Sequence, residues 1–143
     1  MLRVGYEFSR PYVFTAENIK RFADEAGDEN PFHRDEAKAA ASRFGGIIAS
    51  GPHMSAVLMA VCASGEAGAQ DGVGLDFSFR FLRAISAGTS TSLAWTVTSV
   101  EPHEGLKGEL VTLEGRIIDD QGKVYVTCLA HTVVWPEKSG AAA

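Results

Sequence analysis

The sequence contains few cysteines. Only Cys62 and Cys128 occur among 143 residues, with no Cys-x-x-Cys pair and no Cys/His cluster. Two cysteines this far apart exclude a disulfide framework and argue against a zinc site. We therefore predict two buried, reduced thiols that behave as small core side chains.

The sequence also lacks any run of basic residues. Its 13 Lys and Arg residues are outnumbered by 18 Asp and Glu residues, which gives a formal net charge of −5. An acidic chain of this kind is not a general binder of nucleic acid or of anionic membranes, although a local basic patch could hold a phosphate-bearing substrate. Small molecules or proteins are the expected partners.

Long hydrophobic runs are absent as well. No stretch approaches the ~18 apolar residues of a membrane-spanning helix, and the N-terminus shows no apolar segment typical of a signal peptide. We therefore expect a cytoplasmic protein. The hydrophobic content of 45% and charged content of 22% are ordinary, and the length predicts one domain over residues 1–137 with a flexible tail at residues 138–143.

Helical periodicity marks three segments of the chain. Thr15 is a suitable N-cap for the first helix, because apolar residues follow at helical spacing until Gly27. Asp35 is a suitable N-cap for a short Ala-rich helix that we expect to end near Arg43. From Met54 onward, apolar residues recur on more than one helical face, which is typical of a helix buried on several sides.

Strand-like patterns fill most of the remaining chain. Residues 2–14 indicate a short extended segment broken at Pro11, and residues 65–72 indicate a polar, glycine-rich loop. Strand candidates then follow in series, beginning near Leu75, Leu93, Val111 and Val124. A helical half followed by an antiparallel meander predicts an α+β fold in which a sheet curls around one long helix.

The stretch from Asp28 to His33 is the strongest candidate for chemistry. Pro31 disfavours the helical conformation for Asn30, so the stretch is predicted to be an irregular loop that sets a carboxylate and an imidazole five residues apart. Eighteen residues after His33, Gly51 opens the third helical segment. A carboxylate, a histidine and the unpaired N–H groups of a helix start form an acid/base site that can stabilise negative charge on an oxygen.

The loop alone also has a simpler interpretation. Clusters of Asp, Asn and Pro usually form turns, so Asp28 or Asn30 could merely cap a turn while His33 lies on the surface. The additional spacing to Gly51 favours the acid/base site.

The pattern extends beyond the loop. The motif Asp-x-Asn-Pro-x-His is followed by an Ala-rich helix, then by Phe-Gly-Gly-Ile-Ile-Ala and Ser-Gly. In this arrangement the chain resembles the MaoC-like (R)-specific enoyl-CoA hydratases and dehydratases, and the resemblance continues more weakly over nearly the whole chain. It implies a single hotdog domain, in which an antiparallel sheet curls around a long central helix.

The resemblance also implies a role for each residue of the motif. Asp28 and His33 would be the acid/base pair that holds one water, and the Gly51 N–H would donate to the thioester carbonyl of the substrate. Pro31 would stiffen the loop. Asn30 would bond the loop backbone or orient one catalytic side chain, or it would be purely structural.

The implied reaction is the reversible syn hydration of a trans-2-enoyl thioester to an (R)-3-hydroxyacyl thioester, which requires no metal or other cofactor. The implied substrate is a thioester of CoA or of acyl carrier protein, and of the two CoA is favoured because a negatively charged chain offers no obvious docking patch for an acidic carrier. A homodimer is the expected assembly. The alternatives are a thioesterase of the same fold and a non-catalytic acyl-thioester-binding subunit; Met59, which occupies a position where some relatives have serine, keeps the second one open.

Two further histidines have ordinary interpretations. His53 lies in the first turn of the third helix, where it could face the thioester; because a polar side chain in the first turn more often faces solvent, we expect it to do so. His131, in the last strand, is expected to be packed in the fold or at an interface. Neither is predicted to be a ligand.

Overall fold

The computed structural model describes residues 2–64 and 71–135. In chain order its elements are β1 (Glu7–Phe14), α1 (Ala16–Ala26), the 3-10 helix η1 (Pro31–His33), α2 (Glu36–Ala41), α3 (Gly51–Ser64), β2 (Asp71–Phe81), β3 (Thr89–His103), β4 (Gly108–Asp119) and β5 (Val124–Trp135). The predicted tail at residues 138–143 lies outside the described residues.

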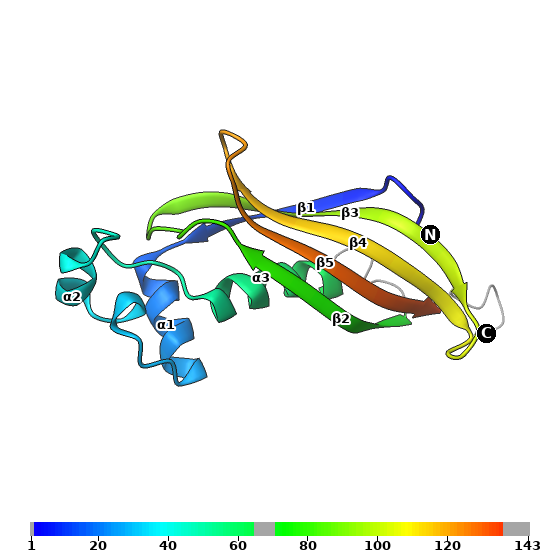
Figure 1. Cartoon of the computed structure of the whole chain (residues 1–143), viewed down its shortest axis with the longest axis horizontal. Helices are drawn as coiled ribbons and strands as arrows, with labels where there is room; N and C mark the ends of the chain where they lie inside the picture. The colour runs from blue at the N-terminus through cyan, green and yellow to red at the C-terminus, as the bar shows by residue number, and fades with distance from the viewer. Residues whose placement is uncertain (1, 65–70, 136–143) are drawn as a thin grey trace.

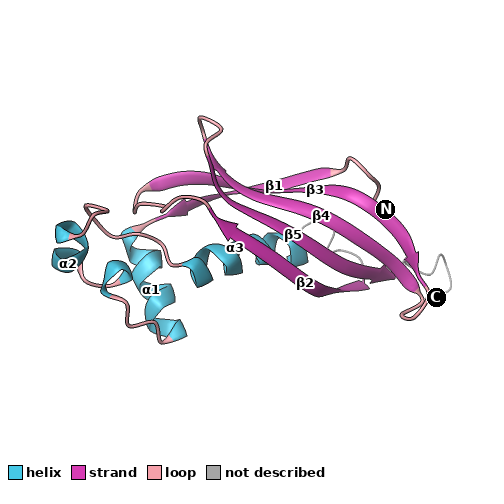
Figure 2. Ribbon diagram, viewed as in Figure 1, coloured by secondary structure: helices cyan, strands magenta, loops and turns pink. Residues whose placement is uncertain are grey.

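All neighbouring strands of the sheet are antiparallel, in the order β1-β3-β4-β5-β2. The sheet is long and curved and arches over α3, while α1 and α2 gather at the end where α3 begins (Figure 1). Figure 2 shows this separation of one strand layer from the helices. The arrangement confirms the predicted α+β hotdog fold.

Helix α3 supplies the centre of the core. Its buried side chains include Met54, Leu58 and Val61, as the predicted periodicity requires. The indole Nε1 of the fully buried Trp95 donates a hydrogen bond to the Leu58 carbonyl at 2.9 Å, which joins the sheet to the middle of the helix. The helix is therefore held by packing and by a satisfied polar contact.

The strands β3 and β4 alternate as predicted. Their inward residues are buried, among them Leu93, Trp95, Val97, Val111, Leu113 and Ile117. The face of strand β5 that carries Leu129 is covered only in part within this chain, because Leu129 is 43% exposed whereas Val133, on the same face, is buried. Both cysteines are buried free thiols, and burial raises the pKa of each to about 11, so they are reduced core residues as expected.

Three boundaries differ from the prediction. Strand β1 is not broken at Pro11, because it lies at the edge of the sheet, where a missing N–H costs no ladder hydrogen bond. Helix α2 ends at Ala41 instead of Arg43, since Ser42 is already extended with φ −79° and ψ 171°. Strand β2 begins at Asp71, inside the segment predicted as a loop, of which residues 65–70 lie outside the described residues. Among the described helices, none is long and apolar enough to cross a membrane.

Candidate active site

The C-terminal end of α1 fixes the position of Asp28 at the start of the loop. Gly27 adopts a left-handed conformation with φ 74°, which closes the helix. The Asp28 N–H then donates to the Ala23 carbonyl at 2.8 Å, so the residue is anchored to the last turn. Its carboxylate Oδ1 accepts the Asn30 N–H at 2.9 Å. No other hydrogen bond among the described residues uses the Asp28 carboxylate, so its second oxygen has no partner there.

Asn30 and Pro31 build the turn that follows. The Asn30 side-chain oxygen accepts the Phe32 N–H at 3.0 Å, which makes Asn30 the N-cap of η1. Pro31 occupies the first position of η1, where a proline is favoured because its N–H would be unpaired in any case. Of the roles left open for Asn30, the structure shows a bond to the loop backbone.

The imidazole of His33 is buried, with 7% of its surface exposed, and is oriented by one hydrogen bond. Its Nδ1 lies 2.7 Å from the Ile48 carbonyl oxygen. A carbonyl can only accept, so Nδ1 carries the proton and the neutral ring keeps its lone pair on Nε2. No hydrogen bond among the described residues uses Nε2, which leaves that nitrogen able to exchange a proton with a ligand.

The first turn of α3 leaves one free amide. The Ser50 hydroxyl accepts the His53 N–H at 3.1 Å, and Pro52 has no N–H to donate. The Gly51 N–H, by contrast, takes part in none of the hydrogen bonds among the described residues. A free N–H at the start of a helix can polarise a carbonyl or stabilise an oxyanion.

Backbone hydrogen bonds hold the loop next to this helix start. The Ile48 N–H donates to the Phe32 carbonyl at 3.1 Å, while the Ile48 carbonyl accepts from His33. Ile48 is therefore bonded to two successive loop residues, three positions before Gly51. The Asp28–His33 loop and the Gly51 amide, far apart in the sequence, are thus brought to the same end of the molecule.

An aromatic side chain borders the Gly51 amide on the sheet side. A Cβ atom built on Gly51 would lie 3.5 Å from Cζ of Phe81, the last residue of β2. The ring is 50% exposed within this chain and stacks on Phe79 with centroids 6.1 Å apart. The amide therefore has an apolar neighbour suited to the alkyl part of a substrate.

The prediction that His53 faces solvent is wrong. Its side chain is only 2% exposed, because the first turn of α3 is covered by β1 and α1. Nε2 lies 2.8 Å from the Tyr12 hydroxyl, while Nδ1 is buried and has no partner in the part of the chain that the structure describes. Burial, aided by the charges of Arg21 and His33, lowers the pKa of His53 to about 4 and keeps the ring neutral.

Arg34 is a supporting residue that sequence reasoning missed. One guanidinium nitrogen donates to the Asp28 carbonyl at 3.3 Å, and another forms an ion pair with Asp24 at 2.7 Å. The side chain therefore ties the loop back to α1. A lone arginine after the motif carries no signal for this role, since the bond depends on how the loop folds back.

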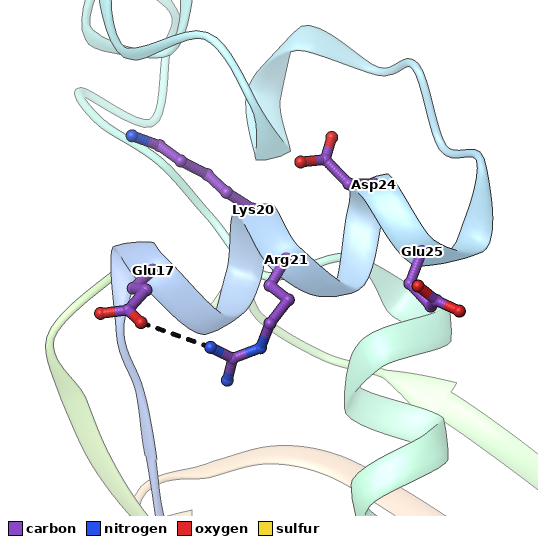
Figure 3. A pocket seen from close by; sticks show the side chains of 5 residues that line it. All are labelled: Glu17, Lys20, Arg21, Asp24 and Glu25. Atoms are coloured by element: carbon purple, nitrogen blue, oxygen red, sulfur yellow. Dashed lines mark hydrogen bonds and ion pairs between the residues drawn. The ribbon is translucent and has the colours of Figure 1, made fainter.

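Two surface depressions in the described part of the chain are not lined by Asp28, His33 or Gly51. One is lined by charged side chains of α1, in which Arg21 pairs with Glu17 (Figure 3). The other lies on the outer face of the sheet and includes Arg80 and Arg116. Within the described ranges, no group of three or more His, Cys, Asp or Glu side chains is arranged to hold a metal ion.

Comparison with known proteins agrees with the fold and with the family resemblance. The sequence profile of the MaoC like domain matches residues 3–126. A UPF0336 protein of Thermobifida fusca is 32% identical over 138 residues, covering 91% of this chain and 88% of the relative. A UPF0336 protein of Streptomyces avermitilis is 27% identical over 144 residues, covering 95% of this chain and 93% of the relative.

Solved structures give the same result. R-hydratase PhaJ1 from Pseudomonas aeruginosa superposes with a TM-score of 0.83 at 26% identity, covering 95% of this chain and 84% of the other. The (R)-hydratase from A. caviae involved in PHA biosynthesis has a TM-score of 0.81 at 25% identity, covering 94% and 98%. A MaoC-like dehydratase from Rhodospirillum rubrum has a TM-score of 0.80 at 27% identity, covering 96% and 95%. Together, the matching domain profile and the shared hotdog fold show that this chain belongs to the MaoC-like family of hydratases and dehydratases.

Proposed function

We propose that this protein catalyses the reversible syn hydration of a trans-2-enoyl thioester to an (R)-3-hydroxyacyl thioester. The observation that carries the proposal is the state of His33, whose Nδ1 is bonded to the Ile48 carbonyl and whose Nε2 has no partner among the described residues. An imidazole held in one tautomer with one nitrogen available is suited to proton transfer. The R-hydratases that share the fold support the choice of reaction.

In the proposed mechanism the chain supplies three groups. The Gly51 N–H donates to the thioester carbonyl, which draws electrons from the double bond and makes C3 electrophilic. Asp28 and His33 hold one water between them, and the pair takes the proton that water loses as its oxygen bonds to C3. That proton passes to C2 on the same face, so the pair ends in its starting state and the two additions are syn.

The substrate is proposed to be a CoA thioester, since the chain carries a net charge of −5 and would repel an acidic carrier protein. Apolar Phe81 beside Gly51 would contact the acyl part.

We also propose a homodimer. Within the described chain β2 pairs only with β5, and its outer edge exposes Val73, Leu75 and Phe81 at 49%, 44% and 50%. Light scattering on a sizing column tests the dimer.

The first test is loss of the enoyl-thioester ultraviolet band after adding purified protein to crotonyl-CoA and to a longer 2-enoyl-CoA. The Asp28→Asn variant serves as control. We expect wild-type protein to remove the band and to form (R)-3-hydroxyacyl-CoA, while the variant does not. Release of free thiol without loss of the double bond would support the thioesterase instead, and no change with either substrate would favour the binding subunit.

The Gly51 amide can be tested with a matched pair of substitutions. Proline is favoured at the first position of a helix, so Gly51→Pro removes the N–H where the backbone tolerates it. Gly51→Ala keeps the N–H, and its added methyl group meets Phe81 at an ordinary 3.5 Å. We expect Gly51→Pro to lower kcat by about 10²–10³-fold, the usual cost of losing one oxyanion donor. Equal activity of the two variants would remove Gly51 from the mechanism.

A further inference from the structure

His53 lies where three elements of the fold meet. It belongs to the first turn of α3, and its ring packs against Phe14 of β1 and Phe22 of α1. The stack on Phe22 is close and nearly parallel, with centroids 4.7 Å apart and 7° between the planes. The ring thus occupies the junction of α3, α1 and the sheet.

Two of these elements, α1 and α3, lead to the two halves of the proposed site. Helix α1 runs directly into Asp28, and α3 presents the Gly51 N–H two residues before His53. Strand β1 contributes Tyr12, whose hydroxyl lies 2.8 Å from Nε2 of His53. A shift of this ring would therefore change the position of the Gly51 amide relative to the loop.

Packing alone does not account for an imidazole at this position. A phenylalanine ring would give the same stacking on Phe22 without burying an unpartnered nitrogen, whereas Nδ1 of His53 is buried with no partner among the described residues. The feature that only the imidazole supplies is the bond to Tyr12. The ring is uncharged at neutral pH, so the Tyr12 O–H can donate to Nε2.

We propose that His53 is a positioning residue: through its bond to Tyr12 and its stack on Phe22, it sets the distance between the Gly51 N–H and the Asp28–His33 pair. The proposal rests on the proposed hydratase function. His53 itself contacts no substrate in this account. It acts by aligning the Gly51 N–H, which contacts the thioester carbonyl, with the Asp28–His33 pair, which acts at the double bond.

A double-mutant cycle between the Tyr12 hydroxyl and the His53 ring tests the proposal. Tyr12→Phe removes only the hydroxyl, and His53→Phe removes both ring nitrogens, among them the Nε2 acceptor, while keeping an aromatic ring. Tyr6→Phe is the matched control, because Tyr6 is also half-buried near β1 and stacks on Phe8, but its hydroxyl makes no hydrogen bond among the described residues. Each single change at the pair should lower kcat by about 10-fold to 100-fold with KM changed less than about twofold, as misplacement of reacting groups does. The double variant should be no slower than the slower single variant, because both remove the same bond.

A second readout does not depend on turnover. In ¹⁵N NMR spectra, Tyr12→Phe and His53→Phe should shift the Gly51 amide and the His33 ring nitrogens more than Tyr6→Phe does. Multiplicative losses of kcat in the double variant, or a KM effect alone, would overturn the positioning role, and so would NMR shifts no larger than those of Tyr6→Phe. Wild-type protein that hydrates no enoyl thioester while these shifts are still seen would contradict the proposed function and leave the alignment by His53 supported.

Discussion

The helical end of the molecule and the interior of the sheet are built differently. At the helical end, the side chains of Asp28 and His33 each make a single hydrogen bond, to the backbone, and one carboxylate oxygen and one ring nitrogen have no partner among the described residues. In the sheet, Trp95 is fully buried and its only polar atom is bonded to the Leu58 carbonyl. Its ring also leaves no room over Gly115, where a Cβ would lie 2.7 Å from it.

This difference separates activity from stability. Groups left free by the fold contribute little to the free energy of unfolding, yet they are the ones able to exchange protons with a ligand. Groups that are packed and satisfied contribute to the free energy of unfolding and face no ligand. Substitutions at the helical end should therefore mainly lower turnover, whereas substitutions in the sheet should mainly lower the free energy of unfolding.

The largest effect is expected for Asp28→Asn. It should lower turnover of an enoyl-CoA by about 10²–10⁴-fold, the usual contribution of a general acid or base, because the amide cannot take a proton from water. The free energy of unfolding should change by less than about 0.5 kcal/mol, since the amide oxygen can still accept the Asn30 N–H. Kinetics and urea unfolding of the same preparation measure both quantities.

His33→Ala sharpens the same comparison. Turnover should fall as for Asp28→Asn, but the Ile48 carbonyl would lose its donor inside the fold, at a cost of about 1–3 kcal/mol in the free energy of unfolding. From the sequence alone we expect little loss of stability for either change, because the loop is not core. An active Asp28→Asn protein, or an active and folded His33→Ala protein, would contradict the assignment of the pair.

The pH dependence of stability should report on His53. Burial lowers its pKa in the folded protein from 6.5 to about 4, with Tyr12 of β1, Arg21 of α1 and His33 of the loop as the neighbouring ionisable groups. Between these pH values the His53 ring is protonated in the unfolded chain but not in the folded protein. The free energy of unfolding therefore falls as the pH drops from 6.5 to about 4, and this contribution does not change above 6.5. The loss should approach about 3 kcal/mol, at ~1.36 kcal/mol per pKa unit.

Urea unfolding of wild-type and His53→Phe protein at about pH 7 and pH 4.5 isolates this contribution. All other ionisable groups are the same in the two proteins. The difference between the pH dependence of the free energy of unfolding in wild type and in His53→Phe is therefore the contribution of His53. Parallel curves would show that the ring is not held neutral in the fold.

In the sheet, Gly115→Ala should lower the free energy of unfolding by about 1–3 kcal/mol, because the new methyl group would overlap the Trp95 ring. Gly46→Ala is the matched control, since a Cβ there meets nothing within 4 Å. Turnover per folded molecule of Gly115→Ala should stay near that of wild type. A stable Gly115→Ala protein with impaired turnover would reverse the proposed division between the two regions.

The smallest effect is expected at the start of α1. Thr15 and Asn18 form a reciprocal capping box, with both hydrogen bonds at 3.0 Å. Thr15→Ala should cost about 1 kcal/mol in the free energy of unfolding, as removal of a helix cap usually does, and should leave turnover unchanged because Asp28 lies beyond the other end of the helix. A large loss of turnover would show that the whole of α1, and not only its last turn, holds the loop.

The sequence patterns predicted the elements better than their partners. Thr15, Asp35 and Gly27 act at helix ends as expected, because capping is a local effect of neighbouring residues. Pro11 was misjudged, since its tolerance depends on β1 being an edge strand. His53 was misjudged for a similar reason: a first-turn position is solvent-exposed only if no other element covers it.

The order of the residues by itself determined the loop from Asp28 to His33, the capping of its helices and the alternation of the strands, because these depend on contacts within a few residues. Only the tertiary structure decided which groups are free. The Ile48 carbonyl that orients His33 lies fifteen residues away along the chain, and Tyr12 lies forty-one residues from His53. Such contacts form only when the helices pack together at one end of the curved sheet. They leave Nε2 of His33 able to take a proton and hold the His53 ring neutral.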